Sequence, residues 1–221
     1  MKIIISGYGK MGHMVEEALL SRGHELVMAS EDVCGIDPAV AAECVCIDFT
    51  TPDAFRANYK FIASSFKAAV IGTTGWDDIL GEVAAAFYSA GTPMIYSSNF
   101  SLGVNAVFAA LERVCDILRT SRYVPHIEET HHVHKKDAPS GTAKTMAEIV
   151  ASHLGTKPDI TSLRIGEVPG THIVKFKSDV DKIKISHEAF SREGFALGAV
   201  VAAEMTEGLT GVHTFKELIL K

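Results

Sequence analysis

The stretch from Lys2 to Gly23 constrains the fold more than any other part of this 221-residue chain. Lys2 to Ser6 contains three consecutive isoleucines, which is typical of a strand buried on both faces of a parallel sheet. The loop that follows has the spacing G-x-G-x-x-G and consists of Gly7, Tyr8, Gly9, Lys10, Met11 and Gly12. Helical spacing of apolar residues then continues until Gly23, a glycine C-cap. Between a buried strand and a helix, such glycines permit a tight turn, close approach of a pyrophosphate and close helix–sheet packing. The pattern predicts a dinucleotide-binding unit; a glycine-rich turn without a ligand is the alternative.

The second predicted strand, His24 to Ala29, leads to two acidic residues, Glu31 and Asp32. Glu31 lies 19 residues after Gly12, near the place where an acid hydrogen-bonds the adenosine ribose hydroxyls. A carboxylate at this position repels the 2′-phosphate of NADP, so NAD is the favoured cofactor. An exposed acidic loop is the alternative interpretation.

Strands and helices alternate strictly over the first hundred residues. After a short connector at 35–42, strands are expected at 45–49, 68–71 and 93–96, with helices beginning at Pro52 and Asp77. This alternation predicts a Rossmann-like, doubly wound parallel sheet of the α/β class, whose ligands bind at the carboxyl ends of the strands. The candidate cofactor-binding residues at those ends are Phe49, Thr50, Gly72, Thr73, Thr74, Ser97, Ser98, Asn99 and Phe100.

The pattern changes after Gly103. We expect helices at 104–118 and 142–153, and strands at 123–129, 163–165, 172–177 and 182–186. Alternation over 182–185 indicates a strand with one wet face, so 103–191 is predicted to be an α+β domain on an open mixed or antiparallel sheet. Such a sheet is also a natural oligomer surface. Helices at 195–205 and 215–220 are expected to cover the first domain, which comprises 1–102 plus 192–221.

Groups suited to acid–base chemistry concentrate just before the predicted helix at 142. Three histidines and two lysines fall within residues 131–136. His131 and Lys135 can donate protons, and the amides of Gly141 and Thr142 would lie at a helix N-terminus, which binds anions. The stretch predicts a pocket that holds a small carboxylate and moves a proton. A solvated turn or an opportunistic metal site are the alternatives.

Composition narrows the class of protein. A hydrophobic fraction of 47% and a charged fraction of 22% are ordinary for a soluble globular protein, and the net charge of -6 argues against a nucleic-acid binder. The chain shows neither a signal-peptide pattern nor an apolar run of membrane-spanning length. The scattered cysteines are expected to be reduced and buried in a cytoplasmic protein; they are Cys34, Cys44, Cys46 and Cys115.

Five motifs together resemble the 4-hydroxy-tetrahydrodipicolinate (dihydrodipicolinate) reductases. The most specific is His131-His132-x-x-Lys135-x-Asp137-Ala138-Pro139-Ser140-Gly141-Thr142-Ala143. The others are Asp48-Phe49-Thr50, Gly72-Thr73-Thr74-Gly75, Ser98-Asn99-Phe100-Ser101-x-Gly103-Val104-Asn105 and Ser191-Arg192-x-x-Phe195-Ala196-x-Gly198-Ala199-Val200. They occur in the order of the family and cover nearly the whole chain.

The resemblance implies an oxidoreductase of lysine and diaminopimelate biosynthesis. Its substrate would be a small cyclic dicarboxylate, 4-hydroxy-tetrahydrodipicolinate, reduced via dihydrodipicolinate to tetrahydrodipicolinate with NADH or NADPH. The resemblance also implies a homotetramer assembled through the sheet of the second domain. His131 would be the general acid/base and Lys135 a second proton donor, while His132, Gly141 and Thr142 would bind substrate carboxylate. The residues at the strand ends would contact the cofactor, and the last motif adds Arg192 to them. His134 has no assigned role and is expected to face solvent or to be structural.

The chain differs from many relatives in a shorter second domain, which affects the strand count of its sheet and the tetramer contacts, and in two details of the first domain, of which the second bears on the cofactor. The glycine loop is one residue shorter than G-x-x-G-x-x-G, and Asp32 stands where relatives that accept NADP often carry a basic residue. We therefore expect NADH to be preferred, with NADPH possible.

Three other functions compete with this one. A dehydrogenase for another small acid, such as aspartate or homoserine, would not need the array from His131 to Thr142. A nicotinamide-sensing binding protein would not need the pair His131 and Lys135. A zinc protein using His131, His132 and His134 lacks supporting cysteine or carboxylate geometry, so no metal is expected.

Overall fold

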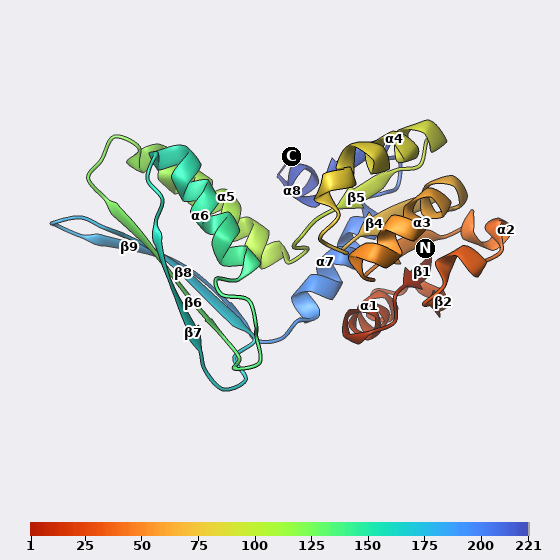
Figure 1. Cartoon of the computed structure of the whole chain (residues 1–221), viewed down its shortest axis with the longest axis horizontal. Coiled ribbons are helices and arrows are strands. Elements are labelled where there is room, and N and C mark those ends of the chain that lie inside the picture. The colour runs from red at the N-terminus through yellow and green to blue at the C-terminus, as the bar shows by residue number, and fades with distance from the viewer. Residues whose placement is uncertain (221) are drawn as a thin grey trace. The chain divides into compact units, whose positions relative to one another are not determined.

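The computed structural model describes residues 1–220, which form two compact units (Figure 1). The first unit comprises Met1–Ser101 together with the C-terminal segment from Glu193 onward. The second unit is the continuous segment Leu102–Arg192. The chain therefore leaves the first unit once and returns to it once.

A six-stranded parallel sheet is the centre of the first unit. Its strands are β1 (Lys2–Ser6), β2 (Glu25–Ser30), β3 (Val45–Asp48), β4 (Ala68–Ile71), β5 (Met94–Tyr96) and β10 (Val212–Thr214). The order is β10-β5-β4-β3-β1-β2, and every neighbouring pair is parallel. The predicted doubly wound parallel sheet is confirmed, but the sequence pattern does not predict β10. This strand has only three residues, all half-buried, so no hydrophobic run marks it, and pairing with β5 defines it.

Helices cover both faces of this sheet. They are α1 (Lys10–Ser21), α2 (Pro38–Ala41), α3 (Pro52–Ser65), α4 (Leu80–Ala90), α7 (Glu193–Glu204) and α8 (Phe215–Ile219), with short 3-10 turns η1 (Val33–Gly35) and η2 (Asp77–Ile79). On one face α3 and α4 bury Phe55 and Phe87, and on the other α1 and α8 bury Leu19 and Phe215. Each such fully buried side chain stabilises the unit by about 1.5–3 kcal/mol. Two apolar layers thus hold the strand ends in fixed positions.

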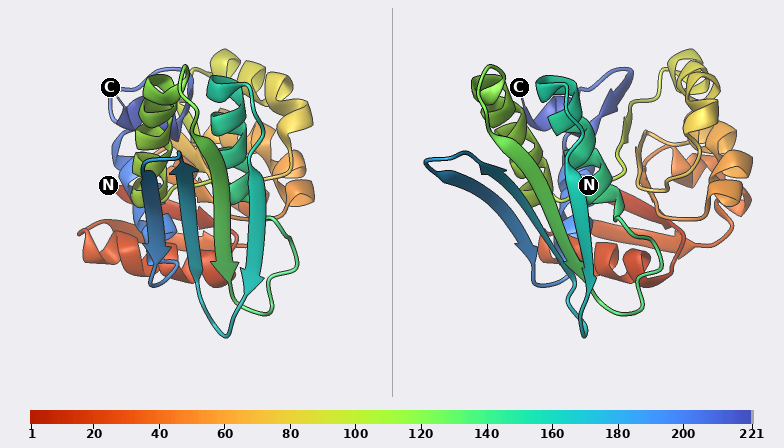
Figure 2. Two further views of the ribbon diagram at one scale, coloured as in Figure 1. Left: turned by 90° about the vertical axis from the view of Figure 1, so that its left-hand side faces the viewer. Right: turned by 60° about the vertical axis from the view of Figure 1, so that its left-hand side comes forward.

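The second unit has a four-stranded mixed sheet of order β7-β6-β8-β9. Its elements are α5 (Leu102–Leu118), β6 (Val124–His131), α6 (Gly141–Leu154), β7 (Asp159–Arg164), β8 (Gly170–Lys177) and β9 (Lys182–Ala189). β6 pairs with β7 in parallel, and the other pairs are antiparallel, which confirms the predicted open mixed sheet. α5 and α6 pack on one face around Ile127, Val174 and Phe176, while no helix of this unit covers the opposite face (Figure 2).

Three details of the second unit differ from the sequence prediction. β7 occupies Asp159–Arg164 rather than 163–165, because the alternating exposure of its residues leaves no apolar run to mark its start. β9 continues to Ala189, and β6 continues to His131, so His131 belongs to a strand and not to a loop. Its side chain therefore has a face fixed by strand alternation.

The prediction of four buried cysteines is wrong for Cys34. All four are free thiols, and Cys44, Cys46 and Cys115 are buried, whereas Cys34 is exposed. It lies in the turn η1, where the neighbouring Val33 is the residue that enters the core. Among residues 1–220, no helix is both long and apolar enough to cross a membrane.

Candidate active site

The glycine loop in the first unit combines close packing with one open position. Gly7 has a φ of +87°, and a Cβ there would lie 2.4 Å from the carbonyl oxygen of Phe49. A Cβ on Gly12 would lie 2.4 Å from the carbonyl oxygen of Gly7, so α1 can approach β1 only with glycine at that position. A Cβ on Gly9 would meet no atom within 4 Å. Gly7 thus fits the requirement of a tight turn, Gly12 that of close helix–sheet packing, and Gly9 that of open backbone for a pyrophosphate.

Glu31 lies beside this loop. The backbone N–H of Tyr8 donates a 2.7 Å hydrogen bond to Glu31 Oε1, which ties the end of β2 to the glycine loop. Glu31 and Asp32 are both exposed. The carboxylate of Glu31 consequently stands next to the glycine loop, whereas that of Asp32 lies beside Gly35 in the turn η1.

The predicted strand-end residues come together at one edge of the sheet. The backbone N–H groups of Gly7, Phe49 and Gly72 donate to the last residues of β2, β1 and β3, at 2.9, 2.9 and 2.8 Å respectively. Thr74 and Ser98 are exposed at this edge, whereas Thr73 and Phe100 are buried. The predicted cofactor residues Tyr8, Met11, Thr50, Ser97 and Asn99 are half-buried, and Lys10 is exposed.

A buried carboxylate, Asp48, links three of these strand ends. It accepts hydrogen bonds from the hydroxyls of Ser6 at 2.7 Å, Thr73 at 2.5 Å and Thr50 at 3.1 Å. Burial raises the pKa of Asp48, and the hydroxyl hydrogen bonds offset only part of that effect. Thr73 also accepts from the backbone N–H of Thr50, at 2.7 Å. Asp48 belongs to the predicted motif Asp48-Phe49-Thr50 without a predicted role, and its hydrogen bonds organise the loops around the glycine turn.

In the second unit, the side chains on the core face of β6 change from apolar to polar along the strand. Ile127, Glu129 and His131 share this face, with Ile127 in the apolar core. Glu129 is paired in register with Ser162 of β7 and with His172 of β8, and His131 is paired with Arg164 of β7. Polar residues from three strands therefore meet at the carboxyl end of β6.

Glu129 is completely buried and ionised. Its Oε1 accepts a 2.9 Å hydrogen bond from Arg164 Nη1, and its Oε2 pairs with His131 Nδ1. Burial raises the pKa of Glu129, but hydrogen bonds from Ser162 and Arg164 and the nearby positive charge outweigh it and hold the pKa below its ordinary value. A buried carboxylate with such partners stays charged.

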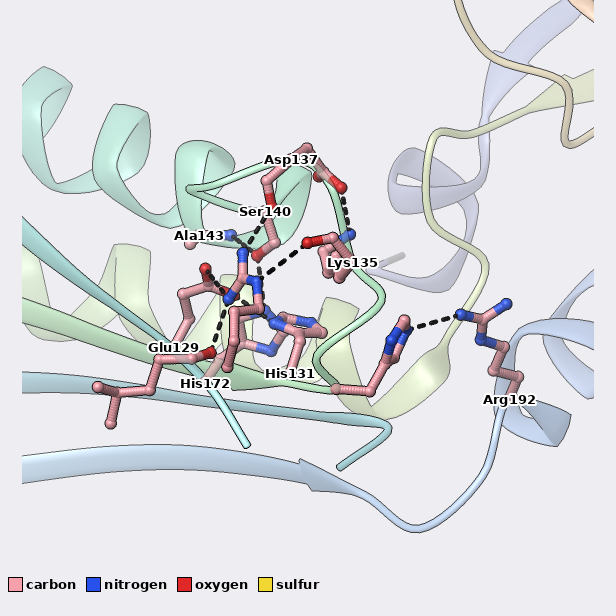
Figure 3. A network of polar contacts seen from close by, with 11 residues as sticks. Glu129, His131, Lys135, Asp137, Ser140, Ala143, His172 and Arg192 are labelled. Carbon is pink, nitrogen blue, oxygen red and sulfur yellow. Dashed lines mark hydrogen bonds and ion pairs between the residues drawn. The ribbon is translucent and has the colours of Figure 1, made fainter. Parts of the chain in front are cut away.

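His131 is 7% exposed, and its ring lies 5.0 Å from that of His172, centroid to centroid (Figure 3). Burial lowers the pKa of His131 even though the charge of Glu129 opposes this change. Burial also lowers the pKa of His172 to about 4. Both pKa changes favour the neutral form of the imidazoles.

His172 contacts the start of α6 through Ser140. Ser140 Oγ lies 3.0 Å from His172 Nε2 and accepts a 3.3 Å hydrogen bond from the backbone N–H of Ala143, which makes it the N-cap of α6. Gly141 is the first helical residue, exposed and without neighbours around a hypothetical Cβ, and Thr142 follows it. The predicted helix N-terminus is present, with Ser140 as its cap and the exposed Gly141 in its first turn.

Lys135 lies on the loop between β6 and α6. Its ammonium pairs with Asp137 Oδ1 at 2.8 Å, as Figure 3 shows. Arg164 holds the same loop by donating from Nε to the carbonyl of Lys135 at 3.3 Å and from Nη2 to the carbonyl of Asp137 at 2.5 Å. One guanidinium thus contacts both the loop of Lys135 and the carboxylate that pairs with His131.

The remaining predicted residues lie at the margin of this group. His132 Nε2 is 3.3 Å from Arg192 Nη2, so Arg192, predicted to contact the cofactor, is found in the second unit beside a predicted carboxylate ligand (Figure 3). His134 is exposed and pairs with Glu167 at 3.3 Å. The zinc hypothesis based on His131, His132 and His134 gains no support, because His134 points to a surface carboxylate.

A different trio has its potential ligand atoms close together. Glu129, His131 and His172 offer nitrogen and oxygen atoms within 4.8 Å of one another. The guanidinium of Arg164 already occupies one oxygen of the carboxylate. The other oxygen pairs with His131, so the carboxylate lies in an ion-pair network between the guanidinium and the imidazole.

Glu129, Arg164 and His172 were not predicted as site residues. One signal for Glu129 was available, because it shares the strand parity of Ile127 and His131. Arg164 and His172 carried no such signal, since only the register of β7 and β8 brings them to β6.

A glycine loop on a parallel sheet, together with a separate unit that carries acid–base groups, defines the class of two-unit α/β oxidoreductases. The chain belongs to the dihydrodipicolinate reductase family. The model of the N-terminal part, "Dihydrodipicolinate reductase, N-terminus", matches residues 1–100, and that of the C-terminal part, "Dihydrodipicolinate reductase, C-terminus", matches residues 103–219. This is a family of pyridine-nucleotide-dependent reductases.

Relatives match over nearly the full length. The chain is 39% identical over 236 residues to a 4-hydroxy-tetrahydrodipicolinate reductase of Christiangramia forsetii, covering 99% of this chain and 98% of the relative. It is 34% identical over 237 residues to the enzyme of the same name from Neisseria gonorrhoeae, covering 96% and 86% respectively. The solved structure of a dipicolinate-bound dihydrodipicolinate reductase from Paenisporosarcina sp. TG-14 has the same fold, with a TM-score of 0.80, 19% identity and 98% of each chain covered. The predicted family and fold class are confirmed.

Proposed function

We propose that the chain reduces 4-hydroxy-tetrahydrodipicolinate, via dihydrodipicolinate, to tetrahydrodipicolinate, as the reduction step of lysine and diaminopimelate biosynthesis. Membership of the family across both halves of the chain supports the reaction. The observation that carries the site is the meeting of His131, the Lys135 loop and the open N-terminus of α6 in one unit.

His131 and Lys135 are the proton donors of this proposal. A nicotinamide dinucleotide would supply a hydride to the conjugated imine, and the electron-rich enamine left on the substrate would then take a proton on carbon. An imidazole suits this step because its ordinary pKa is near neutral pH, and Glu129 stabilises its protonated form. The ammonium of Lys135 holds a substrate carboxylate and stabilises negative charge as it develops.

The substrate carboxylates are assigned to the start of α6 and to His132. Gly141 and Thr142 offer backbone N–H groups at a helix N-terminus, where the helix dipole favours an anion. Ser140 is buried as the N-cap and keeps this end of the helix fixed. A planar dicarboxylate could be held at one end by α6 and at the other by the imidazole of His132.

The edge of the parallel sheet fits a nicotinamide dinucleotide. The open backbone at Gly9 would receive the pyrophosphate, and Glu31 would accept hydrogen bonds from the adenosine ribose. Glu31 and Asp32 are adjacent exposed carboxylates just after β2, and a carboxylate at this position would repel the extra phosphate of NADPH, so we propose that NADH is preferred. A higher kcat/KM with NADPH than with NADH would refute this preference.

The role of Lys135 is tested by Lys135→Ala, with Lys136→Ala as the matched control, because Lys136 is adjacent and exposed. The assay is NADH oxidation with freshly prepared cyclic substrate, and NADH binding is measured in parallel. We expect Lys135→Ala to lower kcat by more than about tenfold, which corresponds to about 1.4 kcal/mol, while NADH affinity stays near that of the parent. Lys136→Ala should keep the parental rate. Retention of kcat within tenfold in Lys135→Ala would remove Lys135 from the mechanism.

We also propose a cytoplasmic homotetramer assembled through the second sheet. The face of this sheet opposite α5 and α6 is not covered by a helix of the second unit and carries the exposed apolar side chains Val124 and Leu163. Light scattering of the purified protein tests the assembly, and a monomer at micromolar concentration would contradict it.

A further inference from the structure

The pair Glu129–Arg164 connects the two groups to which proton transfer is assigned. We propose that Glu129 and Arg164 are positioning residues that couple His131 to the Lys135 loop, so that both proton donors are set in place by one buried ion pair. This inference rests on the proposed function and adds two residues to it.

Strand register brings the pair together. Glu129 and His131 lie two residues apart on the core face of β6, and Arg164 stands opposite His131 on β7. The guanidinium reaches diagonally to Glu129 Oε1 at 2.9 Å, while Glu129 Oε2 is left to face His131 Nδ1. Each oxygen of the carboxylate thus has a different partner, and rotation of the carboxylate would break both contacts.

The second arm of Arg164 holds the loop. Its Nε and Nη2 donate to the carbonyls of Lys135 and Asp137, at 3.3 and 2.5 Å. The side chain of Asp137 in turn pairs with the ammonium of Lys135 at 2.8 Å. A planar guanidinium with five donors can serve the carboxylate and two carbonyls together, whereas the single ammonium of a lysine cannot match that geometry.

The charges around His131 give the pair a measurable signature. The charged or titratable groups that face its ring are Glu129 on β6, Arg164 on β7, His172 on β8 and Lys135 on the loop. Glu129 is the only anion among these four, so loss of its charge lowers the pKa of His131 further. For a general acid, activity is lost as pH rises through its pKa, and the alkaline limb of the pH profile should therefore move to lower pH.

The experiment compares Glu129→Gln and Arg164→Lys with the control Asp116→Asn. Asp116 also pairs with a histidine, His153, at 2.8 Å, but on the surface of the helical layer. With NADH and the cyclic substrate, we expect both site variants to lower kcat by about tenfold or more, the scale of a misplaced general acid, with KM for NADH within about twofold of the parent. Glu129→Gln should also move the alkaline limb of kcat/KM to lower pH, whereas Arg164→Lys, which keeps the positive charge, should leave it in place. Asp116→Asn should match the parent in rate and pH profile.

A double variant separates coupling from general damage. If the pair acts as one unit, Glu129→Gln and Arg164→Lys combined should lower kcat by less than the product of their separate effects. Multiplicative losses, or a Glu129→Gln variant with parental kcat and an unmoved alkaline limb, would overturn the inference. If the two residues had only a structural role, the variants would have a lower melting temperature and a changed KM for NADH, and the alkaline limb of the pH profile would stay in place.

Failure of the proposed reaction can be distinguished from failure of this inference. If the parent protein does not oxidise NADH with the cyclic substrate, the proposed function falls. The proposed effect of Glu129 on His131 can then still be tested by NMR titration of the His131 imidazole, whose signal is assigned with a His131→Asn variant. Its pKa should be lower in Glu129→Gln than in the parent, and an unchanged titration would overturn the inference.

Discussion

Replacing Asp48 by alanine should destabilise the first unit by about 3–6 kcal/mol. The fully buried carboxylate accepts hydrogen bonds from the hydroxyls of Ser6 at 2.7 Å and Thr73 at 2.5 Å. A hydrogen bond to a charged group contributes about 1.5–3 kcal/mol, and alanine would leave two buried hydroxyls without this acceptor. Asp48→Asn keeps one acceptor oxygen, so its cost should be smaller, about 1–2 kcal/mol at neutral pH.

The single tryptophan reports on this network. Trp76 is buried, and its indole N–H donates a 2.6 Å hydrogen bond to the carbonyl of Thr73, whose hydroxyl binds Asp48. Urea unfolding followed by tryptophan fluorescence therefore measures the unit that contains Asp48. Asp53→Ala is the control, because Asp53 lies exposed in the first turn of α3 and should change the unfolding free energy by no more than about 1 kcal/mol. A loss below about 1 kcal/mol in Asp48→Ala would refute the argument that this carboxylate holds the strand ends.

The pH dependence of this effect has a definite sign. Burial raises the folded-state pKa of Asp48 above its ordinary value of 3.8, so the folded protein favours the protonated carboxyl. The stability that Asp48 contributes is then fully present below 3.8 and is partly lost as pH rises through the higher folded-state pKa. Asparagine does not titrate, so the stability gap between parent and Asp48→Asn should narrow as pH rises from about 4 to 7. A gap that widens over this range would contradict the direction of the pKa change.

Three further predictions concern the helix start, the glycine loop and the exposed thiol. Ser140→Ala should destabilise the second unit by about 1–3 kcal/mol in thermal unfolding and raise KM for the substrate. The control is Ser152→Ala on the same helix, whose hydroxyl is hydrogen-bonded only to a backbone carbonyl. This variant should leave KM unchanged. Gly12→Ala should lower the melting temperature, because its Cβ would lie 2.4 Å from a backbone oxygen. In Gly9→Ala the new Cβ would meet no atom within 4 Å, so this variant should keep the melting temperature. It should weaken NADH binding, measured by titration calorimetry. A thiol reagent should modify Cys34 rapidly and the other cysteines only on unfolding; more than one fast thiol per chain by mass spectrometry would contradict the burial pattern.

The parallel sheet was predictable because its strands carry their own signal. β1, β3 and β4 are buried on both faces, so each appears in the sequence as a continuous apolar run between a helix and a glycine- or proline-containing loop. β10 and β7 lack such runs, since the first is a half-buried edge strand of three residues and the second alternates in exposure. Their existence depends on pairing with distant strands, which local pattern does not encode.

The candidate site likewise contains residues that the sequence predicts and residues that only strand pairing brings together. His131, Lys135 and the start of α6 lie within a dozen residues and were found from their chemistry. Arg164 lies 35 residues from Glu129 in the sequence, and His172 lies 32 residues from Ser140. These residues enter the site through the register of β7 and β8 with β6, so they become visible only once the second sheet is known.

The adjacent residues Glu128 and Glu129 show how much that register decides. Strand alternation sends Glu128 to the half-exposed face of β6, where it pairs with Lys175, and Glu129 to the buried face, where it meets Arg164 and His131. The two glutamates are chemically identical and differ only in the face of the strand on which their positions lie. A shift of β6 by one residue would turn every side chain of the strand to the opposite face, burying Glu128 and exposing both Glu129 and His131. Ile127 opposes such a shift because it fills the apolar core on the same face, so the packing of one isoleucine helps keep both Glu129 and His131 on the buried face of β6.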